Sequence, residues 1–152
     1  MTDEMNPTGL ALGQVFLLSA QFGHRENVLS LPANTLVGPQ QIHIALGLTP
    51  LNDGTAYLVQ TTVNSLASDD SRLYDFTVTM AGIFEQQLAI KVLSQDEIVE
   101  VGAAILFPFV REALANLTIR GRFGPVWLNP ISVRAVAARR IDQVVVAEPT
   151  GK

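Results

Sequence analysis

With 152 residues and 48% hydrophobic content, the chain is long enough for one domain with a hydrophobic core, and no change in composition divides it. Charged residues make up only 16%, against about 25% in an ordinary soluble protein, so we expect other copies of the chain to cover part of the surface. The net charge of -4 argues against nucleic-acid binding, and the absence of cysteine excludes disulfides and zinc-thiolate sites.

The two ends of the chain are expected to be disordered tails of a single domain that spans residues 1–152. Residues 1–11 are acidic and lack the basic and apolar regions of a signal peptide, and residues 146–152 form the other tail. The most apolar stretch, residues 101–110, is too short for a membrane span and contains Pro108. We therefore expect a cytoplasmic protein that does not insert into the membrane.

Four segments alternate between apolar and polar residues with the period of two that is typical of β-strands. They cover residues 12–26, 40–48, 56–66 and 73–84. Turn-forming residues at 52–54 and 68–71 join the last three segments as hairpins, which predicts an antiparallel sheet. Proline and glycine in residues 27–39 predict a crossing loop between the first two strands.

The first strand has an ambiguous pattern. Its even-numbered apolar residues are expected to share one face, although Val15 and Leu17 make the opposite face partly apolar too. The even-numbered residues are Phe16, Leu18, Ala20 and Phe22.

A long helix is predicted from Ser94 to about Arg120. Ser94 and Glu97 form a capping box at its start, and Gly121 is expected to end it in the left-handed conformation. Pro108 removes one backbone donor inside the helix and predicts a kink.

This helix is apolar nearly all round, more than one side of a sheet can cover. We therefore expect a second copy of the chain to pack on its outer side. The predicted interface residues are Val101, Gly102, Ile105 and Phe109.

After the helix, an apolar segment stiffened by Pro125 and Pro130 precedes a short predicted helix over residues 132–140 and an extended piece before the C-terminal tail. Two interpretations of this segment stay open. Its apolar residues either cap the core or wall a groove that binds extended polypeptide without requiring a particular sequence. These residues are Val126, Trp127, Leu128 and Ile131.

Residues capable of catalysis or metal binding form no recognisable constellation. His24 and His43 are expected at the surface, and Asp69 and Asp70 suit a turn. We therefore expect neither an enzyme nor a metal or other cofactor. The alternative is a small-ligand binder or hydrolase, which would require a pocket between sheet and helix with a histidine directed into it.

Three motifs in register resemble the SecB family of protein-export chaperones. Residues 81–84, AGIF, are similar to its GGIF element, and residues 105–112, ILFPFVRE, resemble its ILFPYARE segment. Residues 120–123, RGRF, with LNPI at 128–131 and Ala135, look like its RGTFP…LAPVNFDAL passage. The resemblance extends from about Val15 to Ala137.

The resemblance implies an α+β fold in which a four-stranded antiparallel sheet carries a long kinked helix and a short C-terminal helix on one face. It implies a homotetramer, a dimer of dimers joined through the long helix, that binds unfolded preproteins in hydrophobic grooves and passes them to the SecA ATPase. Mapped by motif, Ile42, Ile44 and Leu46 would line the groove together with residues 126–128 and 131.

The chain departs from the family on the surface that would meet SecA. Members present an acidic sheet face and a basic tail, whereas here Asp75 stands among threonines and the tail is AEPTGK. Asp75 is thus the candidate SecA contact. The alternative within the family is a SecB-like chaperone that acts outside export, as in a toxin–antitoxin system.

Overall fold

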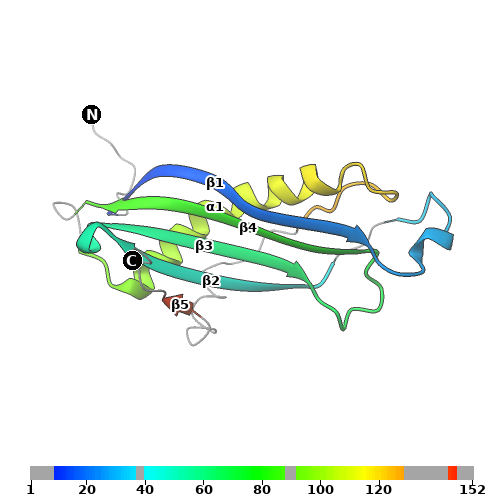
Figure 1. Cartoon of the computed structure of the whole chain (residues 1–152), viewed down its shortest axis with the longest axis horizontal. Helices are drawn as coiled ribbons and strands as arrows, with labels where there is room; N and C mark the ends of the chain where they lie inside the picture. The colour runs from blue at the N-terminus through cyan, green and yellow to red at the C-terminus, as the bar shows by residue number, and fades with distance from the viewer. Residues whose placement is uncertain (1–8, 37–39, 88–91, 129–143, 147–152) are drawn as a thin grey trace.

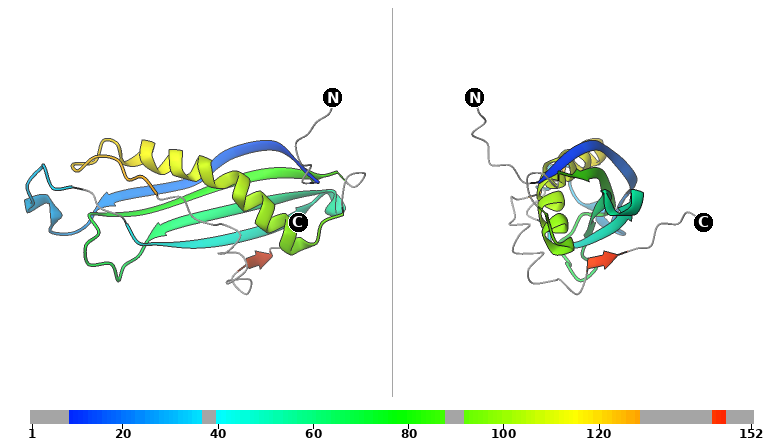
Figure 2. Two further views of the ribbon diagram at one scale, coloured as in Figure 1. Left: turned by 180° about the vertical axis from the view of Figure 1, so that it is seen from behind. Right: turned by 90° about the vertical axis from the view of Figure 1, so that its left-hand side faces the viewer.

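The computed structural model describes residues 9–36, 40–87, 92–128 and 144–146. They form one sheet in the order β1-β4-β3-β2-β5, with a single long helix, α1, across one face (Figures 1 and 2). The elements are β1 (Leu10–His24), β2 (Ile42–Leu51), β3 (Ala56–Ser65), β4 (Tyr74–Gln86), α1 (Gln95–Thr118) and β5 (Val144–Val146), with 3-10 turns at Val28–Ser30 and Asn52–Gly54.

The predicted α+β class and the four antiparallel strands are confirmed, with two differences at the ends of the chain. β5 is a fifth strand, and it pairs parallel to β2. Strand structure also includes Leu10, Ala11 and Val146, so the prediction that they belong to disordered tails is wrong. The predicted helix over residues 132–140 lies outside the described residues.

Strand β1 changes face twice, which explains its ambiguous sequence pattern. Its register with β4 shifts between Leu12 and Gln14 and again between Leu17 and Ser19. Each shift is a bulge, and an extra residue reverses the side-chain alternation beyond it. The prediction that the even-numbered residues share one face is therefore wrong. Ala20 and Phe22 lie opposite Val78 and Phe76, whereas Phe16 lies opposite Ala81, which is on the other face of β4.

The hydrophobic core lies between the inner face of the sheet and α1. The helix packs closely on β3 at Gly102, where a Cβ atom would lie 2.9 Å from Cγ2 of Val59. The largest fully buried side chains come from the sheet, from the helix and from the segment that follows the helix. They are Leu48, Val59, Val63, Tyr74, Val78, Phe84, Ile98, Val99, Leu106, Val110, Leu114 and Val126.

The predicted start of α1 is confirmed, and its end differs from the prediction. Ser94 Oγ accepts from the Glu97 amide at 3.2 Å, and the Glu97 carboxylate accepts from the Ser94 amide at 3.0 Å. The helix continues through Pro108 and bends near its middle (Figure 2). It ends at Thr118, and the glycine with positive φ that follows is Gly124, at 88°.

Gly121 is therefore not the left-handed stop that the sequence predicted. The structure requires glycine there for space, since a Cβ atom would lie 2.6 Å from the Tyr74 hydroxyl oxygen and 2.9 Å from Cζ of Phe22. This contact joins the end of the helix to the end of the sheet.

The β3–β4 turn is organised by Asp69, as predicted from its turn chemistry. The carboxylate accepts from the Ser71 hydroxyl at 2.6 Å, from the Ser71 amide at 3.0 Å and from the Gln41 amide at 3.3 Å. The hydroxyl bond is the main cause that lowers the pKa of Asp69, against the opposing effect of burial. Asp69 thus ties the turn to the chain just before β2.

The lowered pKa of Asp69 predicts a pH-dependent stability. A carboxyl group with a lower pKa in the folded state stabilises the fold above its unfolded pKa of about 3.9, and this stabilisation is lost as the pH falls through the folded value. Urea unfolding should therefore separate wild type from Asp69→Asn at pH 7, and the separation should shrink below about pH 4. Asp70→Asn is the control for an exposed turn carboxylate, and curves that stay parallel down to pH 2 would contradict this role of Asp69.

Two buried threonines allow a matched test of core polarity. The Thr61 hydroxyl, on the inner face of β3, makes no hydrogen bond within the described part of the chain. The Thr118 hydroxyl donates to the Leu114 carbonyl at 2.8 Å and accepts from the Val126 amide at 2.8 Å. Thr61→Val should raise the free energy of unfolding by about 1 kcal/mol, and Thr118→Val should lower it by about 1–3 kcal/mol. Chemical denaturation measures both free energies. Equal effects of the two changes would contradict the difference in hydrogen bonding between Thr61 and Thr118.

Candidate functional site

The segment after α1, residues 122–128, is held to the helix by hydrogen bonds to its backbone. Thr118 accepts from the Val126 amide at 2.8 Å, and Arg111 Nε donates to the Leu128 carbonyl at 2.7 Å. As a result, the side chains of Val126 and Leu128 are buried, and that of Trp127 between them is 61% exposed. The segment presents a large aromatic ring on an anchored backbone.

The start of this segment is fixed by Tyr74. The Tyr74 hydroxyl accepts from the Phe123 amide and donates to the Gly124 carbonyl, both at 2.8 Å. Burial raises the pKa of Tyr74, against the opposing effect of the Phe123 hydrogen bond. The rings of Phe22 and His24 pack against Tyr74 at centroid distances of 4.9 and 5.3 Å.

His24 is a half-buried structural residue and not the surface residue that was predicted. Its Nε2 accepts from the Arg122 amide at 3.0 Å, which requires the neutral ring with Nε2 unprotonated. The Arg122 side chain donates to the Leu31 carbonyl at 3.1 Å and so connects the segment to the loop that follows β1. His43 is on β2, paired with Asn64, on the face away from α1.

The predicted groove residues divide into two groups. Leu46, Val126 and Leu128 are core residues, exposed by 5% or less. Ile42 and Ile44 are half-buried on the inner face of β2, where they pack against the core, and Trp127 is the exposed member. Val126 and Leu128 therefore cap the core, as one interpretation predicts, whereas the groove stays a prediction for which Trp127 is exposed and available. Ile131 lies outside the described residues.

The predicted interface residues of α1 also divide. Val101 and Ile105 are half-buried, and Phe109 is 39% exposed. These three share the outer side of the helix with exposed Ala104 and Pro108. Gly102 does not belong to this stripe, because it is buried against Val59 of the same chain.

A second apolar surface, on β1, was not predicted. Among the described strands, β1 pairs only with β4, which leaves its other edge without a strand partner from that part of the chain. Leu12, Leu17 and Leu18 are 41%, 51% and 48% exposed along it. The sequence feature that could have predicted this surface is the presence of apolar residues on both faces of the strand.

The sheet face away from α1 exposes two acidic side chains of β4, Asp75 and Glu85. Asp75, the candidate SecA contact, forms an ion pair with Arg72, with Nε 2.6 Å from the carboxylate oxygen. Thr62 and Thr79 form a hydrogen bond of 2.8 Å on the same face. A basic partner would therefore find the charge of Asp75 already paired with Arg72, and Glu85 as the other acidic residue of β4 on this face.

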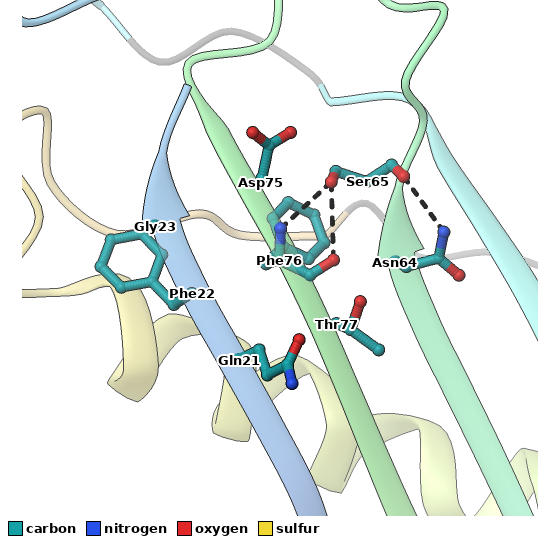
Figure 3. Close-up of a pocket in the computed structure, with 8 residues that line it drawn as sticks. All are labelled: Gln21, Phe22, Gly23, Asn64, Ser65, Asp75, Phe76 and Thr77. Carbon is teal, nitrogen blue, oxygen red and sulfur yellow. Dashed lines mark hydrogen bonds between the residues drawn. The ribbon is translucent and has the colours of Figure 1, made fainter. Parts of the chain in front are cut away.

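This face also carries an open hollow of about 320 Å³ at one end of β1, β3 and β4 (Figure 3). Neither histidine lines it, and it opens on the side opposite α1, whereas the alternative of a small-ligand enzyme requires a pocket between sheet and helix. No group of three or more metal-ligating side chains occurs within the described residues. The lining residues are Gln21, Phe22, Gly23, Asn64, Ser65, Asp75, Phe76 and Thr77.

Comparisons of the sequence with known proteins match this chain to SecB proteins. A family model described as preprotein translocase subunit SecB matches residues 34–144. The protein-export protein SecB of Saccharophagus degradans is 30% identical over 142 residues, which cover 90% of this chain and 82% of the relative. SecB of Pseudomonas aeruginosa is 36% identical over 98 residues, which cover 60% of this chain and 58% of the relative. The chain thus spans little more than half the length of the Pseudomonas protein.

A solved structure shares the fold. The SecB-like chaperone Rv1957 of Mycobacterium tuberculosis, in complex with a ChAD peptide from the Rv1956 HigA1 antitoxin, matches with a TM-score of 0.63 and 17% identity. The match covers 82% of this chain and 92% of that chain. In the part of this chain that the structure describes, no helix is long and apolar enough to cross a membrane.

Proposed function

The chain belongs to the SecB family, and from this premise we propose that it is a chaperone without catalytic activity that holds unfolded polypeptides, chiefly preproteins for export, in the cytoplasm. The observation that supports this most is the exposed Trp127 on an anchored backbone. A rigid aromatic side chain beside apolar residues binds many sequences, because its contact is large and requires no particular partner group.

The proposed groove is smaller than the predicted one. We assign its accessible surface to Trp127 and the half-buried Ile42 and Ile44, and we leave Leu46, Val126 and Leu128 to the core in which they are buried. Ile131 remains a predicted member. Weak apolar contacts of this kind give useful affinity when several copies act on one long polypeptide.

The proposed binding site can be tested with Trp127→Ala. Removing an exposed aromatic contact should weaken binding of a fluorescently labelled, reduced and carboxymethylated α-lactalbumin on the order of tenfold in fluorescence anisotropy. Val92→Ala, at a residue that is 73% exposed outside the proposed groove, is the control and should bind as wild type does. Because the sequence has one tryptophan, binding of a client without tryptophan, such as reduced and carboxymethylated ribonuclease A, should also change the intrinsic fluorescence of the wild type. An unchanged emission and an unchanged affinity of Trp127→Ala would together rule this site out.

We place the oligomer interface on the outer side of α1. Val101, Ile105 and Phe109 form an apolar stripe there, and a homotetramer through the long helix would cover it. A charge buried at the centre of such a contact lacks a partner and costs several kcal/mol.

The oligomer proposal predicts that Ile105→Asp dissociates the assembly. Light scattering should give a smaller particle for this variant and the wild-type mass for Gln95→Asp, which adds the same charge to the exposed first turn of the helix. Aggregation assays should show weaker protection of clients by the dissociated variant, because it loses multivalency. A monomeric Ile105→Asp that protects clients as well as wild type does would contradict the proposal.

A second candidate function within the family is a SecB-like chaperone that acts outside export. The observation that favours it is the pairing of Asp75 with Arg72, which reduces the negative charge available to SecA. Calorimetric titration with SecA distinguishes the two candidates. Binding that Asp75→Asn abolishes would support export, and no binding by a protein that holds clients would support the second candidate.

A further inference from the structure

The outer edge of β2 is occupied by a short strand from the same chain. Val144, Val145 and Val146 pair in parallel with Leu46, Gly47 and Leu48. Strand β2 is longer, from Ile42 to Leu51, so the rest of this edge has no strand partner among the described residues. Figure 2 shows β5 as a short arrow at the margin of the sheet.

The pairing of β5 with β2 is weak, and it places few requirements on the sequence of the strand that pairs. Parallel pairing is slightly less stable per residue than antiparallel pairing, and three residues can form only a few ladder hydrogen bonds. The bonds of a strand ladder join main-chain groups, so any extended segment without proline can form them. The edge therefore binds an extended segment through interactions that an unfolded polypeptide also offers.

We propose that the β2 edge is a strand-addition site for extended apolar segments of unfolded polypeptide, and that Val144–Val146 is an intramolecular competitor for it. This inference rests on the proposed function. The open part of the edge includes Ile42 and Ile44, the half-buried residues of the proposed groove. A client strand would pair with the main chain of β2 and contact these side chains at the same time.

Competition by β5 favours clients that pair with more than three residues of β2. A client that pairs with only three residues of β2 gains no more main-chain bonds than β5 does, whereas a longer extended segment can pair with more of the strand. Apparent affinity falls in proportion to the fraction of molecules whose edge is free. If that fraction is on the order of one tenth, β5 weakens client binding about tenfold. Folded proteins, which expose few long extended segments, would be excluded.

A reversible disulfide that holds β5 on β2 tests whether β5 competes with the client. The sequence has no cysteine, so Gly47→Cys combined with Val145→Cys introduces one possible disulfide between two paired residues. Oxidised, this variant should bind labelled carboxymethylated α-lactalbumin at least about tenfold more weakly than wild type does. Reduction with dithiothreitol should restore wild-type affinity, which separates the effect of the disulfide from any effect of the substitutions.

Releasing β5 should have the opposite effect. Successive amides of a strand point to alternate edges, so we consider Val145→Pro and Val146→Pro separately, since proline removes the amide donor. At least one of them should raise client affinity up to about tenfold, and Val145→Thr, which keeps the amide and the branched side chain, should not. The inference is overturned if the oxidised double-cysteine variant binds as its reduced form does, or if the proline variants bind more weakly than wild type. Failure of wild type to bind the client would instead overturn the proposed function.

Discussion

The packing of α1 against the inner face of the sheet is the contact on which the rest of the structure depends. At Gly102 the helix lies so close to Val59 that a Cβ atom would not fit without a shift of its neighbours. A single helix covers only part of a face built from four long strands, so Ile42 and Ile44 at the start of β2 stay half-buried, whereas Leu46 and Leu48 further along the strand are buried. The same geometry leaves the outer side of the helix with apolar residues that the sheet cannot reach.

The segment after the helix completes this arrangement, and hydrogen bonds to its backbone determine its shape. Thr118 and Arg111 hold it at the helix, and Tyr74 holds its start at the sheet. Because these bonds fix main-chain atoms, the alternation of buried and exposed side chains along the segment is fixed as well. Exposure of Trp127 therefore follows from burial of Val126 and Leu128.

Local patterns in the sequence predicted the local structure well. The capping box at Ser94 and the turn at Asp69 depend on residues only two or three positions apart, and both were predicted correctly. Gly102 and Gly121 were misinterpreted because their small size serves contacts with β3 and Tyr74, distant in sequence. The pairing of β5 with β2 is also a long-range contact that composition does not reveal. The groove residues were predicted from motif matches, and several of them are core residues. A sequence motif gives the identity of a residue and not its exposure.

The bulges in β1 have a consequence for solubility. Fibril growth by stacking of strands requires an unbroken row of main-chain donors and acceptors along an edge. In β1 that row is interrupted after Leu12 and again after Leu17, within the stretch that exposes the most leucine. The two bulges therefore disfavour long ordered stacks of strands along the edge of β1, where these leucines are exposed.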